Sequence, residues 1–210
     1  AALPLFANGW LTHRLPAFEK RHPSLSIAID TSASIADLLL GEADVAIRNL
    51  QTPTSGVWAK KLLDIRAVPL CIPDLAKQIQ SADDFAGQTL IGLTVGRRGW
   101  LDWFAAVGVP EPTDARMLLF DSMTNAIDAA AQGRGVLLAL TPLVWDIPAS
   151  KGLVVPQQFA PQEAGSYYVV CRKEDRTNAA IGGFVDWLCR EMQRDLPRLR
   201  KVDSAARDRF

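Results

Sequence analysis

Short apolar runs alternate with longer amphipathic segments along this chain, and the alternation predicts its elements. The first fifty residues predict a strand at 2–6, a helix at 9–22, a strand at 24–30, a helix at 35–40 and a strand at 43–48. Ser34 is placed to cap the second helix, and Gly41 is placed to end it. This β-α-β-α-β order implies a parallel sheet with right-handed crossovers.

A second cycle follows a polar turn at 51–56 and a long apolar strand at 57–72. Its pattern predicts strands at 88–93, 116–120 and 135–140, with helices at 99–109 and 122–133 between them. Thr141 is then expected to cap a short helix that has Pro142 at its first position. A strand at 166–172 and an amphipathic helix at 177–194 complete the pattern, and the polar residues that follow predict a frayed tail.

The two cycles are joined by two long strands, at 57–72 and 166–172. This arrangement predicts an α/β chain with two Rossmann-like lobes and a cleft between them. In such folds ligands bind at the carboxyl ends of the strands, so a ligand is expected between the lobes.

Composition narrows the class of protein. Over 210 residues, 23 lysines and arginines balance 23 acids, so the formal net charge is zero and the chain by itself is not expected to bind duplex DNA specifically. No apolar run reaches the roughly 18–20 residues of a membrane helix. The first residues lack a signal-peptide pattern, and the abrupt start suggests a fragment of a longer protein. The three cysteines are far apart, which suggests reduced thiols in a cytosolic protein.

Signals for catalysis are weak. His13 and His22 both fall on the first predicted helix, and no Ser–His–acid or Cys–His set can be built around them. The stretches "GRRGW" and "GRG" lack the pattern of a phosphate-binding loop and are expected to be turns. Asp83 and Asp84 lie in a turn context, and no cluster has metal-ligand spacing. We therefore expect neither an enzyme nor a cofactor or metal site.

Small polar residues follow the predicted strands, where helices begin. They are Asn8, Thr31, Ser32, Thr94, Asp121, Ser122 and Thr141. Helix N-termini have free N–H groups and partial positive charge, so such an edge attracts a carboxylate or another anion. For each of these residues taken alone, helix capping is the alternative to ligand binding. Arg48, at the end of a short apolar strand, either pairs with a ligand carboxylate or forms a structural salt bridge.

Several motifs in order resemble the LysR-type transcriptional regulators. They are "WLTHRLPAFEKRHPSLSIAI", "LLLGEADVAIRN", "LCIPDLA" and "LFDSMTNAIDAAAQGRGVLLALTPLV". The match runs from about residue 5 to 192, and the chain is most similar to the subgroup of the glycine-cleavage activator and the β-lactamase regulators. The resemblance implies the effector-binding domain, with the type 2 periplasmic-binding-protein fold. Lobe I would comprise residues 1–68 and 167–195, and lobe II would comprise residues 69–166. A polar tail at 196–210 would follow lobe I.

The resemblance also implies an effector pocket. Its positions fall on Leu5, Phe6, Thr31, Ser32, Arg48, Thr94, Ser122, Thr141 and the hinge residue Tyr167. The family often has Ser or Thr where this chain has Leu5. With Trp10, Trp100 and Trp103 expected nearby, the pocket would be more apolar than usual, which leaves aromatic carboxylates and larger metabolites open as effectors.

By this resemblance the chain senses a small, anionic metabolite and controls transcription. DNA would be contacted only by a winged helix-turn-helix expected before Ala1, and RNA polymerase is a further expected partner. A cytoplasmic homodimer or tetramer is implied, in which the segments 10–22 and 25–30 of one subunit pack against 122–133 of another, without membrane contact. The alternatives are an extracytoplasmic solute-binding protein of the same fold and an enzyme on the same scaffold.

Overall fold

The computed structural model describes residues 1–31, 38, 41–52, 55–94, 99–156, 159 and 161–207. The chain divides into two compact units. Unit 1 comprises Ala1–Ile65 and Ala164–Leu199, and unit 2 comprises Arg66–Glu163 and Arg200–Phe210. Strands β2 (Val57–Leu70) and β6 (Gln162–Arg172) each contribute residues to both units.

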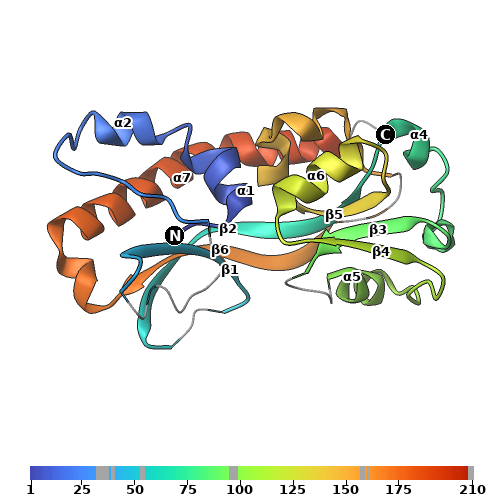
Figure 1. Ribbon diagram of the computed structural model, residues 1–210, viewed down its shortest axis with the longest axis horizontal. Helices are drawn as coiled ribbons and strands as arrows, with labels where there is room; N and C mark the ends of the chain where they lie inside the picture. The colour runs from blue at the N-terminus through green and yellow to red at the C-terminus, as the bar shows by residue number, and fades with distance from the viewer. Residues whose placement is uncertain are drawn as a thin grey trace. The chain divides into compact units, whose positions relative to one another are not determined.

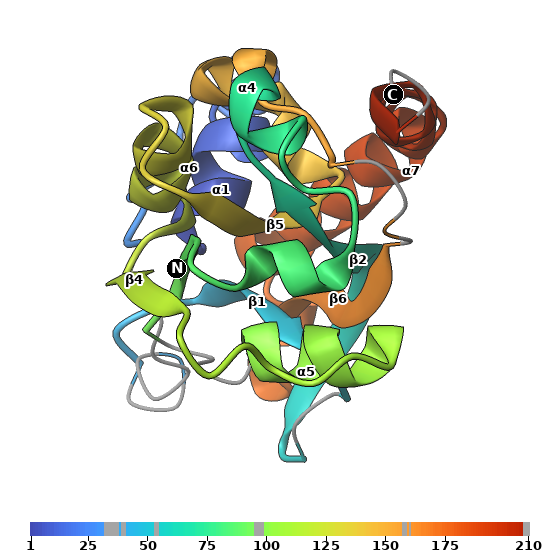
Figure 2. The same ribbon diagram turned by 90° about the vertical axis from the view of Figure 1, so that its right-hand side faces the viewer.

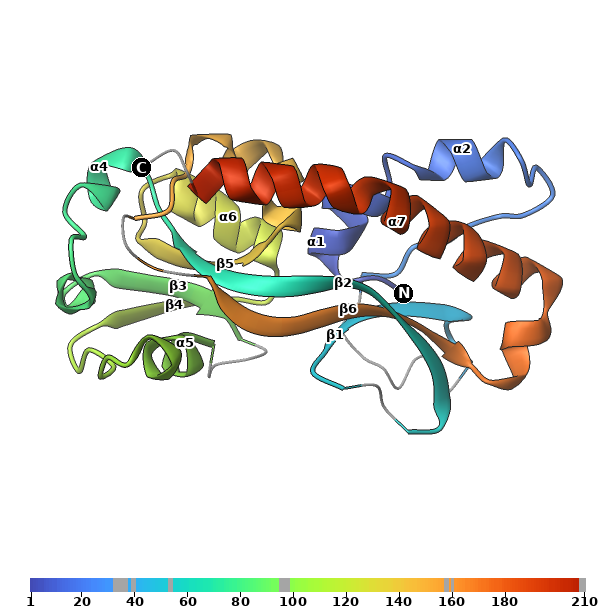
Figure 3. The same ribbon diagram turned by 180° about the vertical axis from the view of Figure 1, so that it is seen from behind.

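In unit 1 the strand order is β1-β6-β2. Strand β1 (Val45–Leu50) pairs antiparallel with β6. Helices α1 (Pro4–Phe6), α2 (Leu15–Glu19) and α7 (Ala179–Arg207) lie on one side of these strands, as does the π-helix Ala7–Leu11 that follows α1 (Figures 1 and 3). The core here is built from apolar side chains such as Phe6, Trp10 and Val170.

The first thirty residues differ from the pattern-based prediction. The expected strand at 2–6 is the short helix α1, because Pro4 begins a helix readily but cannot donate to a ladder. The expected helix at 9–22 is divided into the π-helix and α2, which has Pro16 in its first turn. Residues 24–30 belong to no ladder within the described residues. Among the described residues, β1 and β6 pair antiparallel, and Ala2 and Ile47 form a parallel bridge.

Unit 2 follows the predicted alternation closely. Its strand order is β2-β5-β3-β4, and β3 (Thr89–Leu93) pairs in parallel with both β4 (Arg116–Phe120) and β5 (Val136–Thr141). Helices α5 (Gly99–Val107) and α6 (Met123–Ala131) lie on opposite faces of these strands (Figure 2). The short helix α4 (Pro73–Ala76) follows β2. Thr141 ends β5, and Pro142 takes the N-cap position of a 3-10 helix, Leu143–Asp146, which corrects the expected cap.

The predicted tail is helical instead of frayed, since α7 continues to Arg207 beyond Pro197. Two buried side chains anchor this extension. Leu199 is 1% exposed within unit 1, and in unit 2 the buried carboxylate of Asp203 accepts a hydrogen bond from Trp145 Nε1 at 3.1 Å. These contacts offset the loss of one helical hydrogen bond at the proline. The predicted helix at 35–40 lies outside the described residues except for Leu38.

Candidate functional site

Three of the predicted hydroxyl residues lie at one edge of the sheet in unit 2. Strands β3, β4 and β5 run in parallel, so their carboxyl ends share an edge. Thr94 follows β3, and its N–H donates to the carbonyl of Phe120, the last residue of β4, at 2.8 Å. Ser122 follows β4, and Thr141 is the last residue of β5. The strand-end pattern in the sequence therefore corresponds to hydroxyl groups on neighbouring strands.

Ser122 occupies the N-cap position of α6 without capping it. Its backbone is extended, but its side chain makes no hydrogen bond to the first turn. The hydroxyl instead shares a hydrogen bond of 2.7 Å with that of Thr124. The N–H groups at the start of α6 thus donate no hydrogen bond to this side chain, and the partial positive charge there favours an anion.

Arg66 is a neighbour of this edge that the sequence pattern did not indicate. The β2–β5 register places it directly opposite Thr141, whose hydroxyl donates to the Arg66 carbonyl at 3.4 Å. Thr141 is 1% exposed, whereas Arg66 is exposed. Arg66 lies inside a long predicted strand, and the β2–β5 register is what places this residue beside the end of β5.

In unit 1, two of the predicted residues form an aromatic pair. The rings of Phe6 and Tyr167 lie 5.2 Å apart at an interplanar angle of 56°, and both side chains are buried. Leu5 is also buried, next to Phe6 on α1. Burial raises the pKa of the Tyr167 hydroxyl well above its ordinary value, because the phenolate would lose its hydration. Tyr167 is therefore a neutral hydrogen-bonding group at physiological pH.

Arg48 lies inside β1 instead of at its end, and its residue is only 4% exposed. The β1–β6 register places it opposite Tyr168. Its Nη1 donates to the carbonyl of Ile47 at 3.0 Å. A buried guanidinium needs hydrogen-bonding partners, and this contact within unit 1 favours the structural alternative for Arg48.

The remaining predicted residues have different surroundings. Asn8 and Thr31 are exposed in unit 1, and Ser32 lies outside the described residues. Trp100 is 2% exposed and belongs to an aromatic core in unit 2 that also contains Phe85, Trp103 and Phe104. Its Nε1 donates to the carbonyl of Ile91 at 2.9 Å, which satisfies the only polar atom of the side chain. These contacts explain why Trp100 is buried in the core of unit 2.

Reactive groups are poorly placed for covalent chemistry in the part of the chain that the structure describes. His13 and His22 are exposed, and the ring of His22 stacks on Phe18. All three cysteines are buried and unpaired with one another, and burial raises the pKa of Cys71 to about 12. Among the same residues, no group of three or more His, Cys, Asp and Glu side chains could hold a metal ion. No helix in this part is both long enough and apolar enough to cross a membrane.

Comparison with known proteins identifies the family. A model described as the LysR substrate binding domain matches residues 1–193, which is most of the chain. The chain belongs to this family. The HTH-type transcriptional activator AmpR of Pseudomonas aeruginosa is 31% identical over 189 residues, which are 89% of this chain and 63% of that protein. The glycine cleavage system transcriptional activator of Escherichia coli K12 is 26% identical over 189 residues, 89% of this chain and 62% of that protein.

The fold agrees with that of solved members of the LysR family. The AmpR effector binding domain from Citrobacter freundii superposes with a TM-score of 0.80 at 26% identity, covering 92% of this chain and 96% of that structure. The predicted α/β fold of the type 2 periplasmic-binding-protein kind is thereby confirmed, as is the resemblance to the two named regulators. The chain spans between 62% and 65% of the length of the curated relatives AmpR, y4mQ and the glycine cleavage activator.

Proposed function

We propose that this chain is the ligand-sensing part of a bacterial LysR-type transcriptional regulator and that it binds a small, anionic metabolite. The observation that carries the proposal is the edge of unit 2, where Thr94, Ser122 and Thr141 lie at the carboxyl ends of three parallel strands in a chain of this family. Hydroxyls and helix N–H groups together suit a carboxylate, because each donates a hydrogen bond to its charge. Arg66, opposite Thr141, adds a cation nearby.

Unit 1 has candidate residues of its own. Leu5, Phe6 and Tyr167 form a largely apolar group with one hydroxyl, which suits contact with an aromatic or aliphatic group. Asn8, Thr31 and Ser32 remain candidates for polar contacts on this unit. Arg48 and Trp100 remain candidates as well, and each is buried with a side chain that donates to a backbone carbonyl of its own unit.

Binding would act by shifting a conformational equilibrium. A ligand favours the arrangement to which it binds more tightly, and the difference in affinity sets how far the population moves. In the whole regulator this shift would reach a DNA-binding winged helix-turn-helix, in a cytoplasmic homodimer or tetramer, with RNA polymerase as a further partner. The relatives are transcriptional regulators, so neither a solute-binding protein nor an enzyme is favoured.

A thermal-shift screen of carboxylate metabolites tests the proposal. A ligand that binds only the folded chain raises its melting temperature as its concentration rises. We expect hits among carboxylates and a loss of each hit when the carboxylate is converted to its methyl ester. Ligands without a carboxylate that raise the melting temperature, or carboxylates whose methyl esters still raise it, would contradict an anion-binding edge.

A further inference from the structure

Helix α7 has a basic, solvent-exposed face. Between residues 190 and 201 the chain has five basic residues and two acids, although its overall formal charge is zero. At about 100° per residue, four of the basic residues fall within about a quarter of the helix circumference. These four residues, all exposed, form the basic row of α7: Arg190, Arg194, Arg198 and Lys201.

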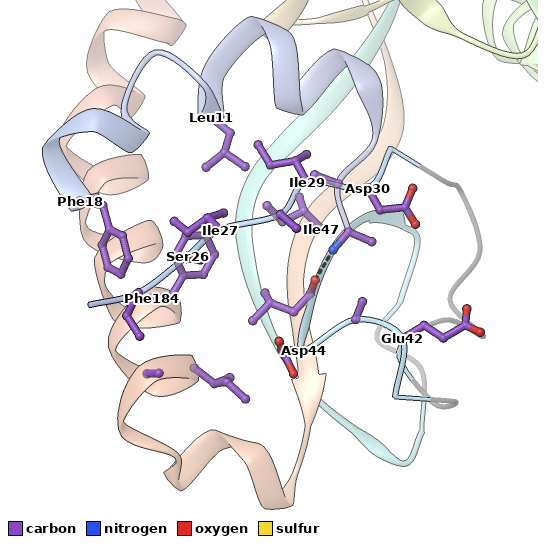
Figure 4. Close-up of a pocket in the computed structure, with 18 residues that line it drawn as sticks. Leu11, Phe18, Ser26, Ile27, Ile29, Asp30, Glu42, Asp44, Ile47 and Phe184 are labelled. Atoms are coloured by element: carbon purple, nitrogen blue, oxygen red, sulfur yellow. Dashed lines mark hydrogen bonds between the residues drawn. The ribbon is translucent and has the colours of Figure 1, made fainter. Parts of the chain in front are cut away.

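The apolar residues of α7 lie on its other side and pack inside unit 1. The ring of Phe184 lies 5.3 Å from that of Phe18, and the two side chains line one pocket (Figure 4). Leu188, Met192 and Leu199 are each at most 1% exposed. Because this packing fixes the rotation of the helix about its axis, it also holds the basic row towards solvent.

The two acids beside the row do not cancel its charge. Glu191 pairs with Arg194 at 2.7 Å. Asp195 pairs with Arg198 at 2.6 Å, but the same carboxylate also pairs with Arg14 at 2.5 Å. Two guanidinium groups thus share one carboxylate, and this cluster keeps a positive charge.

The ends of the row are cations without a nearby acid. Arg190 and Lys201 form no ion pair within the described part of the chain. They are separated by three helical turns, which is about 16 Å at a rise of about 1.5 Å per residue. One strand of duplex DNA has a phosphate about every 3.4 Å along the helix axis, so the row is as long as about five phosphates. We propose that the basic row of α7 binds the phosphate backbone of duplex DNA.

The make-up of this face favours a nucleic acid over a protein partner. Protein–protein interfaces usually have an apolar centre with aromatic anchors. The large apolar side chains that are exposed in the described chain are Ile29, Leu101 and Met117, and none of them belongs to α7. Arginine and lysine donate hydrogen bonds to phosphate oxygens and neutralise their charge.

Phosphate contacts of this kind position a duplex without reading its sequence. The proposal therefore agrees with the expectation that the chain alone does not bind duplex DNA specifically. Under the proposed function, the row would add contacts to those of the winged helix-turn-helix. None of the proposed effector-binding residues lies on α7, so the row is independent of the effector site.

Fluorescence anisotropy with a labelled duplex of about 24 base pairs and arbitrary sequence tests the proposal. In about 50 mM salt the parent chain should bind with a dissociation constant in the micromolar range. The row variant carries Arg190→Gln, Arg194→Gln and Lys201→Gln. Its matched control, with the same net charge, changes three exposed residues outside α7 by the substitutions Arg116→Gln, Arg134→Gln and Lys151→Gln.

The row variant should bind the duplex about tenfold or more weakly than the parent, and the control less than about threefold more weakly. Salt dependence gives a second measure, because the logarithm of the affinity falls by about 0.9 per neutralised phosphate for each unit of log salt concentration. This slope should be about −3 to −4 for the parent and the control, and smaller in magnitude by about 2 to 3 for the row variant. Both variants should melt within about 2 °C of the parent, since exposed substitutions change stability little.

Three outcomes would overturn the proposal. They are no binding by the parent in about 50 mM salt, an equal loss in the two variants, and a salt slope that is unchanged in the row variant. Poly-L-glutamate that binds the row more tightly than the duplex, at equal charge concentration, would assign the row to an acidic protein instead. Carboxylate ligands should raise the melting temperature of the row variant as they do for the parent, so this test and that of the effector site can fail separately.

Discussion

The hydroxyl of Ser122 lies 2.7 Å from that of Thr124, and it does not cap the helix α6 that it precedes. The side chain is therefore available to a ligand at little cost to the helix. This relationship distinguishes Ser122 from an ordinary capping serine, whose loss costs about 1 kcal/mol of stability.

The first prediction follows from this geometry. Ser122→Ala should weaken binding of a carboxylate effector by about tenfold, which corresponds to the loss of one charge-assisted hydrogen bond. The melting temperature of the ligand-free chain should change by less than about 2 °C. Isothermal titration calorimetry measures the affinity, and Thr177→Ala, an exposed hydroxyl bonded to the Glu174 carbonyl, is the control. A Ser122→Ala chain that is destabilised but binds normally would show that the residue acts only on the fold.

The second prediction separates the two roles of Arg48. Because its guanidinium is buried in unit 1, Arg48→Ala should lower the free energy of unfolding of the ligand-free chain by about 2–4 kcal/mol. The exposed Arg190→Ala should change it by less than about 0.5 kcal/mol. Urea titrations of both variants give these values. Unchanged stability together with about tenfold weaker effector binding would instead assign Arg48 to the ligand.

The third prediction concerns acid stability and Asp195. Burial acts to raise the pKa of this carboxyl, but hydrogen bonds from Arg198 and Trp10 and the charge of Arg14 outweigh it and hold the pKa below its ordinary value. A depressed folded pKa contributes stability above the unfolded pKa of about 4, and this contribution is lost as the pH falls through the folded pKa.

Asp195→Asn should therefore reduce the free energy of unfolding by about 1–3 kcal/mol at pH 7. The difference from the parent chain should shrink as the pH falls below about 4, where the parent carboxyl begins to take up its proton. Urea titrations at pH 7, 5 and 3 measure it. Asp74→Asn, which removes an exposed pair with Lys77, serves as the control and should have little effect. A constant difference at all three pH values would contradict the ionic role of Asp195.

The fourth prediction is self-association. The resemblance to the LysR family implies that residues 10–22 and 25–30 of one copy pack against 122–133 of another around a two-fold axis. Sedimentation velocity should show a dimer at micromolar concentration. Asn125→Arg, on the exposed side of α6, should shift the population towards monomer, whereas Lys77→Glu, at the C-cap of α4, should not. A chain that stays monomeric at hundreds of micromolar would contradict this interface.

Most of unit 2 could be predicted from the sequence alone. The strands at 88–93, 116–120 and 135–140 and the helices between them appear within about two residues of their predicted bounds. These elements are set by local hydrophobic periodicity and by turn residues, which a sequence displays directly. The hydroxyl residues at the strand ends and the motifs of the family could be recognised in the sequence for the same reason.

Tertiary structure decided what depends on partners distant in the chain. Arg48 ends an apolar run in the sequence, and only the tertiary structure shows that it lies within β1, opposite Tyr168, and is 4% exposed. Only the tertiary structure shows that Trp100, a predicted pocket residue, packs against Phe85 and Trp103. Residues 24–30 have the pattern of a strand but join no ladder in the described part of the chain, because a strand forms only where another backbone satisfies its hydrogen bonds. The sequence determined which segments could become strands and helices, and the long-range packing decided which of them found partners and which charged or aromatic side chains were buried.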